Sequence, residues 1–113
     1  VVASVSGMHP YPGSGAYSAS KAALLMLVRQ LAQEWAADGL RVNVVSPGMV
    51  RTPLTEPIYA NDDLRRRREA LVPMHRIGTP EDIAGVVEFV LSPSGASYMT
   101  GQNIVMDGGR SAW

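Results

Sequence analysis

The chain has 113 residues, which is enough for one domain with a hydrophobic core and too few for a second independent domain. Its ten basic residues balance ten acidic ones, so no overall field would attract nucleic acid or an anionic membrane, and no apolar run approaches the roughly 18 residues of a membrane helix. Without cysteine the chain forms neither disulfides nor a cysteine zinc site, and we expect a cytoplasmic protein without a bound metal.

The first segment has the pattern of a strand followed by a loop. Residues 1–5 are mostly β-branched and apolar, and residues 6–15 then collect prolines, glycines and serines. A strand of a parallel sheet needs neighbours on both edges, yet this one opens the chain without methionine or a signal peptide. We therefore expect that elements preceding it are missing from this sequence.

A long helix is predicted from Ala16 to a stop at Gly39. Its apolar residues recur with helical spacing at Leu24, Leu27, Val28, Leu31 and Trp35. The other face is also apolar in the first turns, which indicates that this helix needs burial on two sides.

The remainder of the chain predicts two more strands and one more well-marked helix. A β-rich run over residues 41–46 closes at Pro47 and Gly48, where proline removes a ladder donor and glycine permits an unusual backbone dihedral. Residues 49–78 contain three prolines and four consecutive arginines, a pattern that predicts short helices and mobility. The sequence Thr79-Pro80-Glu81-Asp82 is typical of a helix start, and residues 102–106 predict the third strand.

This alternation of strands and helices predicts an α/β fold, in which a parallel sheet is connected by crossover helices. Ligands of such folds gather at the carboxyl ends of the strands. The loops that begin at Ser4 and at Ser46 both leave strands at that edge, so we expect them to lie side by side.

Tyr17 and Lys21 stand four residues apart at the start of the long helix, so their side chains share one face. A phenol is a poor base at neutral pH, but an adjacent ammonium and the positive end of a helix both favour the phenolate. The same spacing is also common where a solvated lysine lies beside a half-buried tyrosine. Ser4, thirteen residues before Tyr17, adds a hydroxyl that can face the phenol across a substrate oxygen.

Three segments together resemble successive signatures of the classical short-chain dehydrogenase/reductases: Ser4-Val-Ser-Gly7, Tyr17-Ser-Ala-Ser-Lys21 and Arg41-Val-Asn-Val-Val-Ser-Pro47-Gly48. Residues 76–84 and 98–109 are similar to the family's last helix and last strand, so the resemblance runs across essentially the whole chain. It implies a Rossmann-type doubly wound parallel sheet. Residues 1–113 would form the C-terminal catalytic half of that single domain, with about three strands, and the N-terminal dinucleotide-binding half would be absent.

The resemblance also implies roles for individual residues. Tyr17 would be the general acid/base, and Ser4 would hydrogen-bond the substrate oxygen, with Ser6 as the alternative serine. Lys21 would favour the phenolate and bind the ribose hydroxyls of the nicotinamide nucleotide.

The cofactor is implied by a second, independent block. Pro47, Gly48, Val50 and Thr52 are similar to the family's loop beneath the nicotinamide, and with Tyr17 and Lys21 they complete the expected cofactor contacts. The family's glycine-rich dinucleotide loop is not matched in this sequence, so the preference for NAD or NADP is left open.

The function implied by the resemblance is an NAD- or NADP-dependent oxidoreductase that interconverts a secondary alcohol and a ketone. Its partners would be a small-molecule substrate and further copies of itself, as a dimer or tetramer, because the family's long helix usually packs on a neighbouring subunit. The alternative is a truncated or non-catalytic fragment that acts only in binding or oligomerisation. Two features stay open: His9 and Tyr11 either line the substrate pocket or are exposed, and the arginine run over residues 65–68 is a solvated helix face or an anion site.

Overall fold

The computed structural model describes residues 1–112 and has a small parallel sheet at its centre. Strands β1 (Val44–Pro47) and β2 (Asn103–Met106) pair along their whole length. Val2 forms an isolated parallel bridge to Val45, and the Ala3 N–H donates to the Val45 carbonyl at 2.8 Å. The three predicted parallel strands are therefore present as two strands and one bridged segment, with β1 in the middle.

The predicted first strand is shorter than expected because the chain turns at Ser4. Residues Val5–Gly7 form one turn of 3-10 helix, η1, and the buried Ser4 side chain caps this turn by accepting the Ser6 N–H at 3.1 Å. A serine hydroxyl that bonds the local backbone competes with continued strand pairing. The extended segment accordingly ends at the residue that the sequence marks as a candidate for catalysis.

Helix α1 (Gly15–Trp35) confirms the long helix predicted from the sequence. A short 3-10 turn, η2 (Ala36–Asp38), continues it until Gly39, whose φ of 77° is the left-handed conformation expected at a helix end. Val28 of α1 is fully buried, and it joins Ala3 and Val44 in the core. The helix thus packs on the sheet through the apolar positions that repeat at helical spacing.

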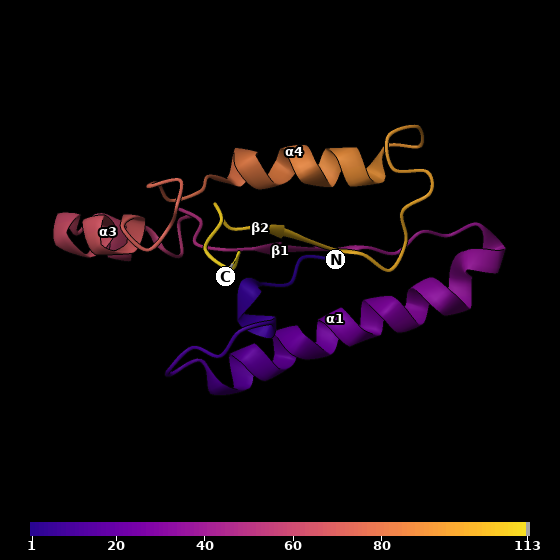
Figure 1. Cartoon of the computed structure of the whole chain (residues 1–113), viewed down its shortest axis with the longest axis horizontal. Coiled ribbons are helices and arrows are strands. Elements are labelled where there is room, and N and C mark those ends of the chain that lie inside the picture. The colour runs from indigo at the N-terminus through magenta and orange to yellow at the C-terminus, as the bar shows by residue number, and fades with distance from the viewer. Residues whose placement is uncertain (113) are drawn as a thin grey trace.

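Helix α4 (Pro80–Leu91) covers the face of the sheet opposite α1, so that the two helices enclose β1 and β2 (Figure 1). Its start is a capping box in which Thr79 and Asp82 each bond the other's backbone N–H. Parallel strands with crossover helices on both faces confirm the predicted α/β arrangement. No helix among the described residues is long and apolar enough to cross a membrane.

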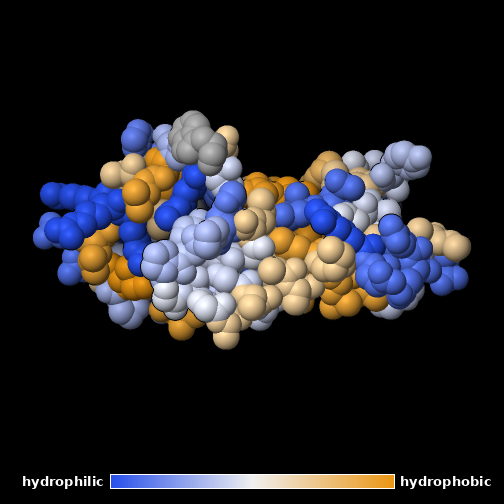
Figure 2. Space-filling model, turned by 60° about the horizontal axis from the view of Figure 1, so that its bottom comes forward, coloured by the Kyte–Doolittle hydropathy of each residue, from blue (hydrophilic) through white to orange (hydrophobic). Residues whose placement is uncertain are grey.

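Two short helices, α2 (Glu56–Tyr59) and α3 (Asp62–Glu69), follow β1 and confirm the short helices predicted for this stretch. Helix α3 carries the arginine run at one end of the molecule (Figure 1), where hydrophilic side chains gather in Figure 2. Along α1, by contrast, Met26 and Leu27 remain 62% and 48% exposed, and apolar surface lies between the hydrophilic ends in Figure 2. The sequence predicted that α1 is buried on two sides. The described residues bury only the side that packs on the sheet.

Candidate active site

Ser4 is held beside α1 by a close approach between two backbones. A Cβ atom added at Gly7, the last residue of η1, would lie 2.7 Å from the Lys21 carbonyl carbon and 2.8 Å from the Ala22 nitrogen. Backbone atoms cannot rotate aside as a flexible side chain can, so this position requires glycine. The contact fixes η1, and with it Ser4, against the turn of α1 that carries Lys21.

Tyr17 and Lys21 lie in the first two turns of α1 and are close in space. The Lys21 Nζ lies 5.6 Å from the centroid of the Tyr17 ring and donates to the Val2 carbonyl at 3.4 Å. Tyr17 is 52% exposed, and no described residue forms a hydrogen bond with its hydroxyl. The phenol is therefore free to exchange a proton with a bound molecule.

The Ser4 side-chain oxygen is held in place by a local hydrogen bond. It accepts the Ser6 N–H at 3.1 Å, while no acceptor for the hydroxyl proton lies among the described residues. A hydroxyl both accepts and donates. Ser4 can therefore donate to a substrate oxygen without giving up its structural bond.

Gly48 follows β1 and passes directly against the turn after β2. A Cβ atom here would lie 2.6 Å from the Asp107 Cβ, and the Gly48 N–H donates to the Met106 carbonyl at 2.8 Å. The unusual dihedral that glycine permits is not used at Gly48, because its φ is not in the positive range. Glycine is required here by close packing against a residue far away in the sequence, which local turn chemistry does not predict.

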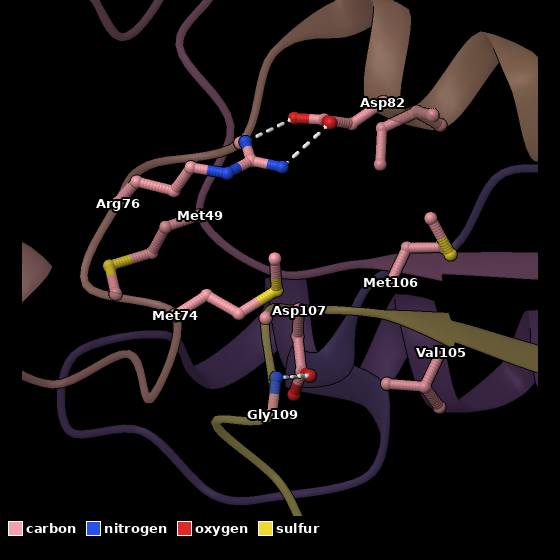
Figure 3. Close-up of a pocket in the computed structure, with 11 residues that line it drawn as sticks. Met49, Met74, Arg76, Asp82, Val105, Met106, Asp107 and Gly109 are labelled. Carbon is pink, nitrogen blue, oxygen red and sulfur yellow. Dashed lines mark hydrogen bonds and ion pairs between the residues drawn. The ribbon is translucent and has the colours of Figure 1, made fainter.

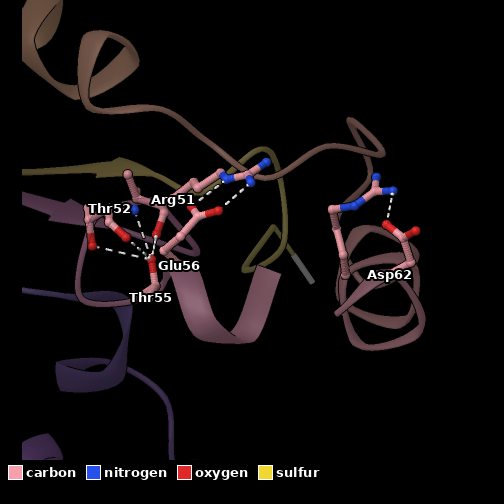
Figure 4. Close-up of polar contacts among 7 residues, drawn as sticks. Arg51, Thr52, Thr55, Glu56 and Asp62 are labelled. Atoms are coloured by element: carbon pink, nitrogen blue, oxygen red, sulfur yellow. Dashed lines mark hydrogen bonds and ion pairs between the residues drawn. The ribbon is translucent and has the colours of Figure 1, made fainter. Parts of the chain in front are cut away.

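The rest of the loop is fixed by Thr55, a residue that the sequence analysis did not single out (Figure 4). Its Oγ1 donates to the Val50 carbonyl at 2.9 Å and accepts the Thr52 N–H at 2.8 Å. Arg51 and Glu56 add a two-pronged ion pair at 2.6 and 2.8 Å, and the Arg51 hydrogen bond holds the pKa of Glu56 below its ordinary value. The sequence did carry a signal for this role, because Thr52 and Thr55 stand three residues apart just before a short helix.

These segments meet around one open cavity of about 620 Å³. Six predicted site residues line it: Ser4, Tyr17, Pro47, Gly48, Val50 and Thr52. Lys21 does not line the cavity and adjoins it through Tyr17. Thr55, the buried Tyr59 and Arg68 also line this space, although the sequence analysis had assigned none of them to the site.

Known proteins share this arrangement of sequence and structure. Residues 1–111 match the family described as Enoyl-(Acyl carrier protein) reductase. Dehydrogenase/reductase SDR family member 4 of Sus scrofa is 38% identical over 112 residues, which cover 99% of this chain and 40% of that protein. The chain belongs to the short-chain dehydrogenase/reductase family. A tropinone reductase homolog of Arabidopsis thaliana is 44% identical, over 97% of this chain and 40% of the homolog.

The fold is likewise that of a solved short-chain dehydrogenase/reductase. A structure of 4-hydroxyisoleucine dehydrogenase complexed with NADH is 40% identical and superimposes with a TM-score of 0.94, over 99% of this chain and 46% of the other. The chain thus spans less than half the length of the relatives that it matches. The family and the Rossmann-type fold predicted from the sequence are confirmed.

A separate cavity of this short-chain dehydrogenase/reductase chain, about 320 Å³, is lined by Met49, Met74 and Met106 (Figure 3). At its edge Arg76 forms a two-pronged ion pair with Asp82 at 2.6 and 2.8 Å, and this pair holds the pKa of Asp82 well below its ordinary range. Thioethers are weak acceptors, and the carboxylate is already paired. This cavity therefore lacks the free proton donors and acceptors that line the one beside Tyr17.

Asp107 lies at the edge of the same cavity, and its carboxylate accepts hydrogen bonds from the turn after β2. Burial disfavours its charged form, but hydrogen bonds from Ser111, Gly109 and Arg110 outweigh that effect and hold its pKa below the ordinary value. The Gly109 and Ser111 N–H groups donate to the carboxylate at 2.9 and 2.8 Å. Asp107 is thus a structural acceptor that fixes the surface on which Gly48 packs.

Proposed function

We propose that the protein carrying this chain interconverts a secondary alcohol and a ketone with NAD(H) or NADP(H). The observation that carries this proposal is that Ser4, Tyr17 and the loop of residues 47–52 line one cavity, with Lys21 next to the tyrosine. Residues from three separate segments of the sequence meet there in the pattern of the family's catalytic signatures.

The proposed proton transfer uses the free Tyr17 hydroxyl. In oxidation the Tyr17 oxygen, as phenolate, takes the proton of the substrate hydroxyl, and in reduction the phenol returns a proton to the developing alkoxide. The Lys21 ammonium lies over the same ring, 5.6 Å from its centroid. Ser4, whose proton has no acceptor among residues 1–112, donates to the same substrate oxygen and stabilises its negative charge.

The residues present fit a nicotinamide nucleotide. Val50 lines the cavity, and while its carbonyl accepts from Thr55, its N–H has no partner among the described residues. Val50, Thr52 and Lys21 would hold the nucleotide through this amide, a hydroxyl and the ammonium. When bound, the nicotinamide accepts or supplies the hydride. Pro47 and Gly48 keep the loop close to the sheet, since the Gly48 N–H donates to the Met106 carbonyl.

Tyr17→Phe tests the proton-transfer role, with Tyr98→Phe as a matched control because Tyr98 is fully exposed. We expect Tyr17→Phe to lower turnover at least 100-fold, the lower end of the effect of a general acid/base, and to leave NADH or NADPH affinity within about threefold of wild type. Tyr98→Phe is expected to change neither. Undiminished turnover in Tyr17→Phe would exclude Tyr17 as the acid/base.

Fluorescence titration with NADH and NADPH separates an oxidoreductase from the binding or oligomerisation module considered above. The gene product that carries this chain is expected to bind one of the two nucleotides more tightly, which also identifies the preferred cofactor. Lys21→Met is expected to weaken that binding because it removes the ammonium. A gene product that binds neither nucleotide contradicts the oxidoreductase proposal.

The exposed apolar side of α1 supports a homo-oligomer, as a dimer or tetramer. Met26 and Leu27 remain 62% and 48% exposed next to each other on this helix, and association would bury them. Sedimentation velocity is expected to give the mass of a dimer or tetramer for the gene product, and a Leu27→Glu variant is expected to shift it toward monomer. A monomeric wild type would contradict this proposal.

A further inference from the structure

A second cavity, of about 370 Å³, adjoins the one beside Tyr17. The two cavities share four lining residues, Ser4, Ser6, Gly48 and Arg68. The second cavity is also lined by Tyr11 and Arg110, whereas His9 lines neither of them. A molecule that presents an oxygen to Ser4 therefore has room to extend toward two arginines.

Arg68 and Arg110 converge on a single sulfur atom. Their Nη1 atoms lie 4.0 and 3.2 Å from the Met49 Sδ, so the separation of the two nitrogens cannot exceed the sum of these distances. Thioether sulfur is a weak acceptor. Neither guanidinium has another acceptor or a carboxylate partner among residues 1–112.

Other arginines of the chain are satisfied differently. Arg51, Arg65 and Arg76 each form an ion pair with a carboxylate. Arg41 donates to the carbonyls of Ala96, Met99 and Val90. Arg68 and Arg110 thus differ in being half-buried while their strong donors remain available within the described structure.

The position of Arg110 is set by Tyr11. Its guanidinium carbon lies 5.1 Å from the centroid of the Tyr11 ring, an arrangement that stabilises a cation through the ring face. Contact with the ring face leaves those guanidinium N–H groups that point away from the ring available for hydrogen bonds. Two cations this close repel each other, and an anion between them removes that repulsion.

We propose that Arg68 and Arg110 bind an oxyanion of the substrate, a carboxylate or a phosphate, while its alcohol or ketone carbon lies at Ser4 and Tyr17. The inference rests on the proposed function and specifies the substrate class as a hydroxy acid, an oxo acid or their phosphate equivalents. One oxygen can bridge nitrogens about 5.6 Å apart at ordinary charge-assisted distances, and the two oxygens of one carboxylate bridge a wider pair. Both nitrogens lie close to the Met49 sulfur, and this limits how far apart they can be. The limit is compatible with such a bridge.

The four arginines of residues 65–68 differ in their surroundings. Arg65 is paired with Asp62 and Glu69, and Arg66 and Arg67 are exposed. Only Arg68 of the run lines the two cavities. The run is therefore a solvated helix face that contributes one cation to the proposed anion site.

Calorimetric titration of the gene product tests the inference without requiring turnover. The probes are lactate, 3-hydroxybutyrate and 4-hydroxypentanoate, each beside its methyl ester, and glycerol 3-phosphate beside glycerol. We expect at least one anion to bind tenfold or more tightly than its uncharged counterpart, and the hydroxy acids and the phosphate ester identify which oxyanion is preferred. Arg68→Gln and Arg110→Gln should each reduce that preference at least fivefold, whereas Arg67→Gln on the same helix should not.

Three results would overturn the inference. They are the absence of any preference for an anion over its counterpart, equal losses in Arg68→Gln and Arg67→Gln, and an Arg68→Gln variant that loses nucleotide affinity instead of anion affinity. The last result would assign the arginine to the cofactor. Failure of the oxidoreductase proposal is distinguishable, because wild-type protein would then bind no nucleotide whether or not it prefers anions.

Discussion

Replacing Gly7 with alanine tests whether the contact between η1 and α1 positions the site. The added methyl group would lie 2.7 Å from the Lys21 carbonyl carbon, and ordinary van der Waals contact begins at 3.4 Å. The two segments must therefore separate by about 0.7 Å, the difference between these distances. Overpacking of this kind costs roughly 1–3 kcal/mol of stability. Displacement of a catalytic group by about 1 Å costs on the order of 100-fold in rate, so kcat/KM should fall between tenfold and 100-fold.

Urea denaturation and steady-state kinetics of Gly7→Ala measure the two effects separately. Gly85→Ala is the matched control, because Gly85 lies within α4 and a Cβ there meets nothing within 4 Å. Alanine in a helix interior is expected to raise stability by up to about 1 kcal/mol. Wild-type stability in Gly7→Ala would refute the close approach. Lost stability with unchanged kcat/KM would refute the claim that this contact positions Ser4.

Three further changes probe other parts of the structure. Val28→Ala, at a fully buried core position, should lower the free energy of unfolding by about 2 kcal/mol in urea titration, and an effect below about 0.5 kcal/mol would contradict the described core. Ser4→Ala should lower kcat at least tenfold while the nucleotide Kd stays constant. A tenfold loss of kcat in Ser6→Ala, with none in Ser4→Ala, would instead assign the role to Ser6. The Arg76 hydrogen bond and then the Thr79 N–H hold the pKa of Asp82 below its ordinary value, so its contribution to stability is present at neutral pH and is lost as pH falls below about 4. Urea midpoints of wild type and Asp82→Asn should therefore differ at pH 7 and converge in acid, and a constant difference would contradict this linkage.

The sequence determined those features that depend on neighbours along the chain. Spacing of four residues places Tyr17 and Lys21 on one helix face, and the capping signal at Thr79 fixes the start of α4. The order of strands and helices predicted the α/β fold, and the resemblance of the motifs predicted the family. The helix face, the helix start and the fold class follow from periodicity and capping signals within a few residues, which a single sequence displays directly, whereas the family rests on the resemblance alone.

The tertiary structure alone decided the contacts between distant residues that no predicted motif connects. Gly48 is confined by Asp107, and Arg68 of α3 meets Arg110 of the last turn over the Met49 sulfur, although the three lie in separate segments of the sequence. Local periodicity carries no information on such pairs, because their separation depends on how helices and turns pack across the sheet. For the same reason, the arginine run looked uniform in the sequence, and only packing selected Arg68 as the member that lines the cavities.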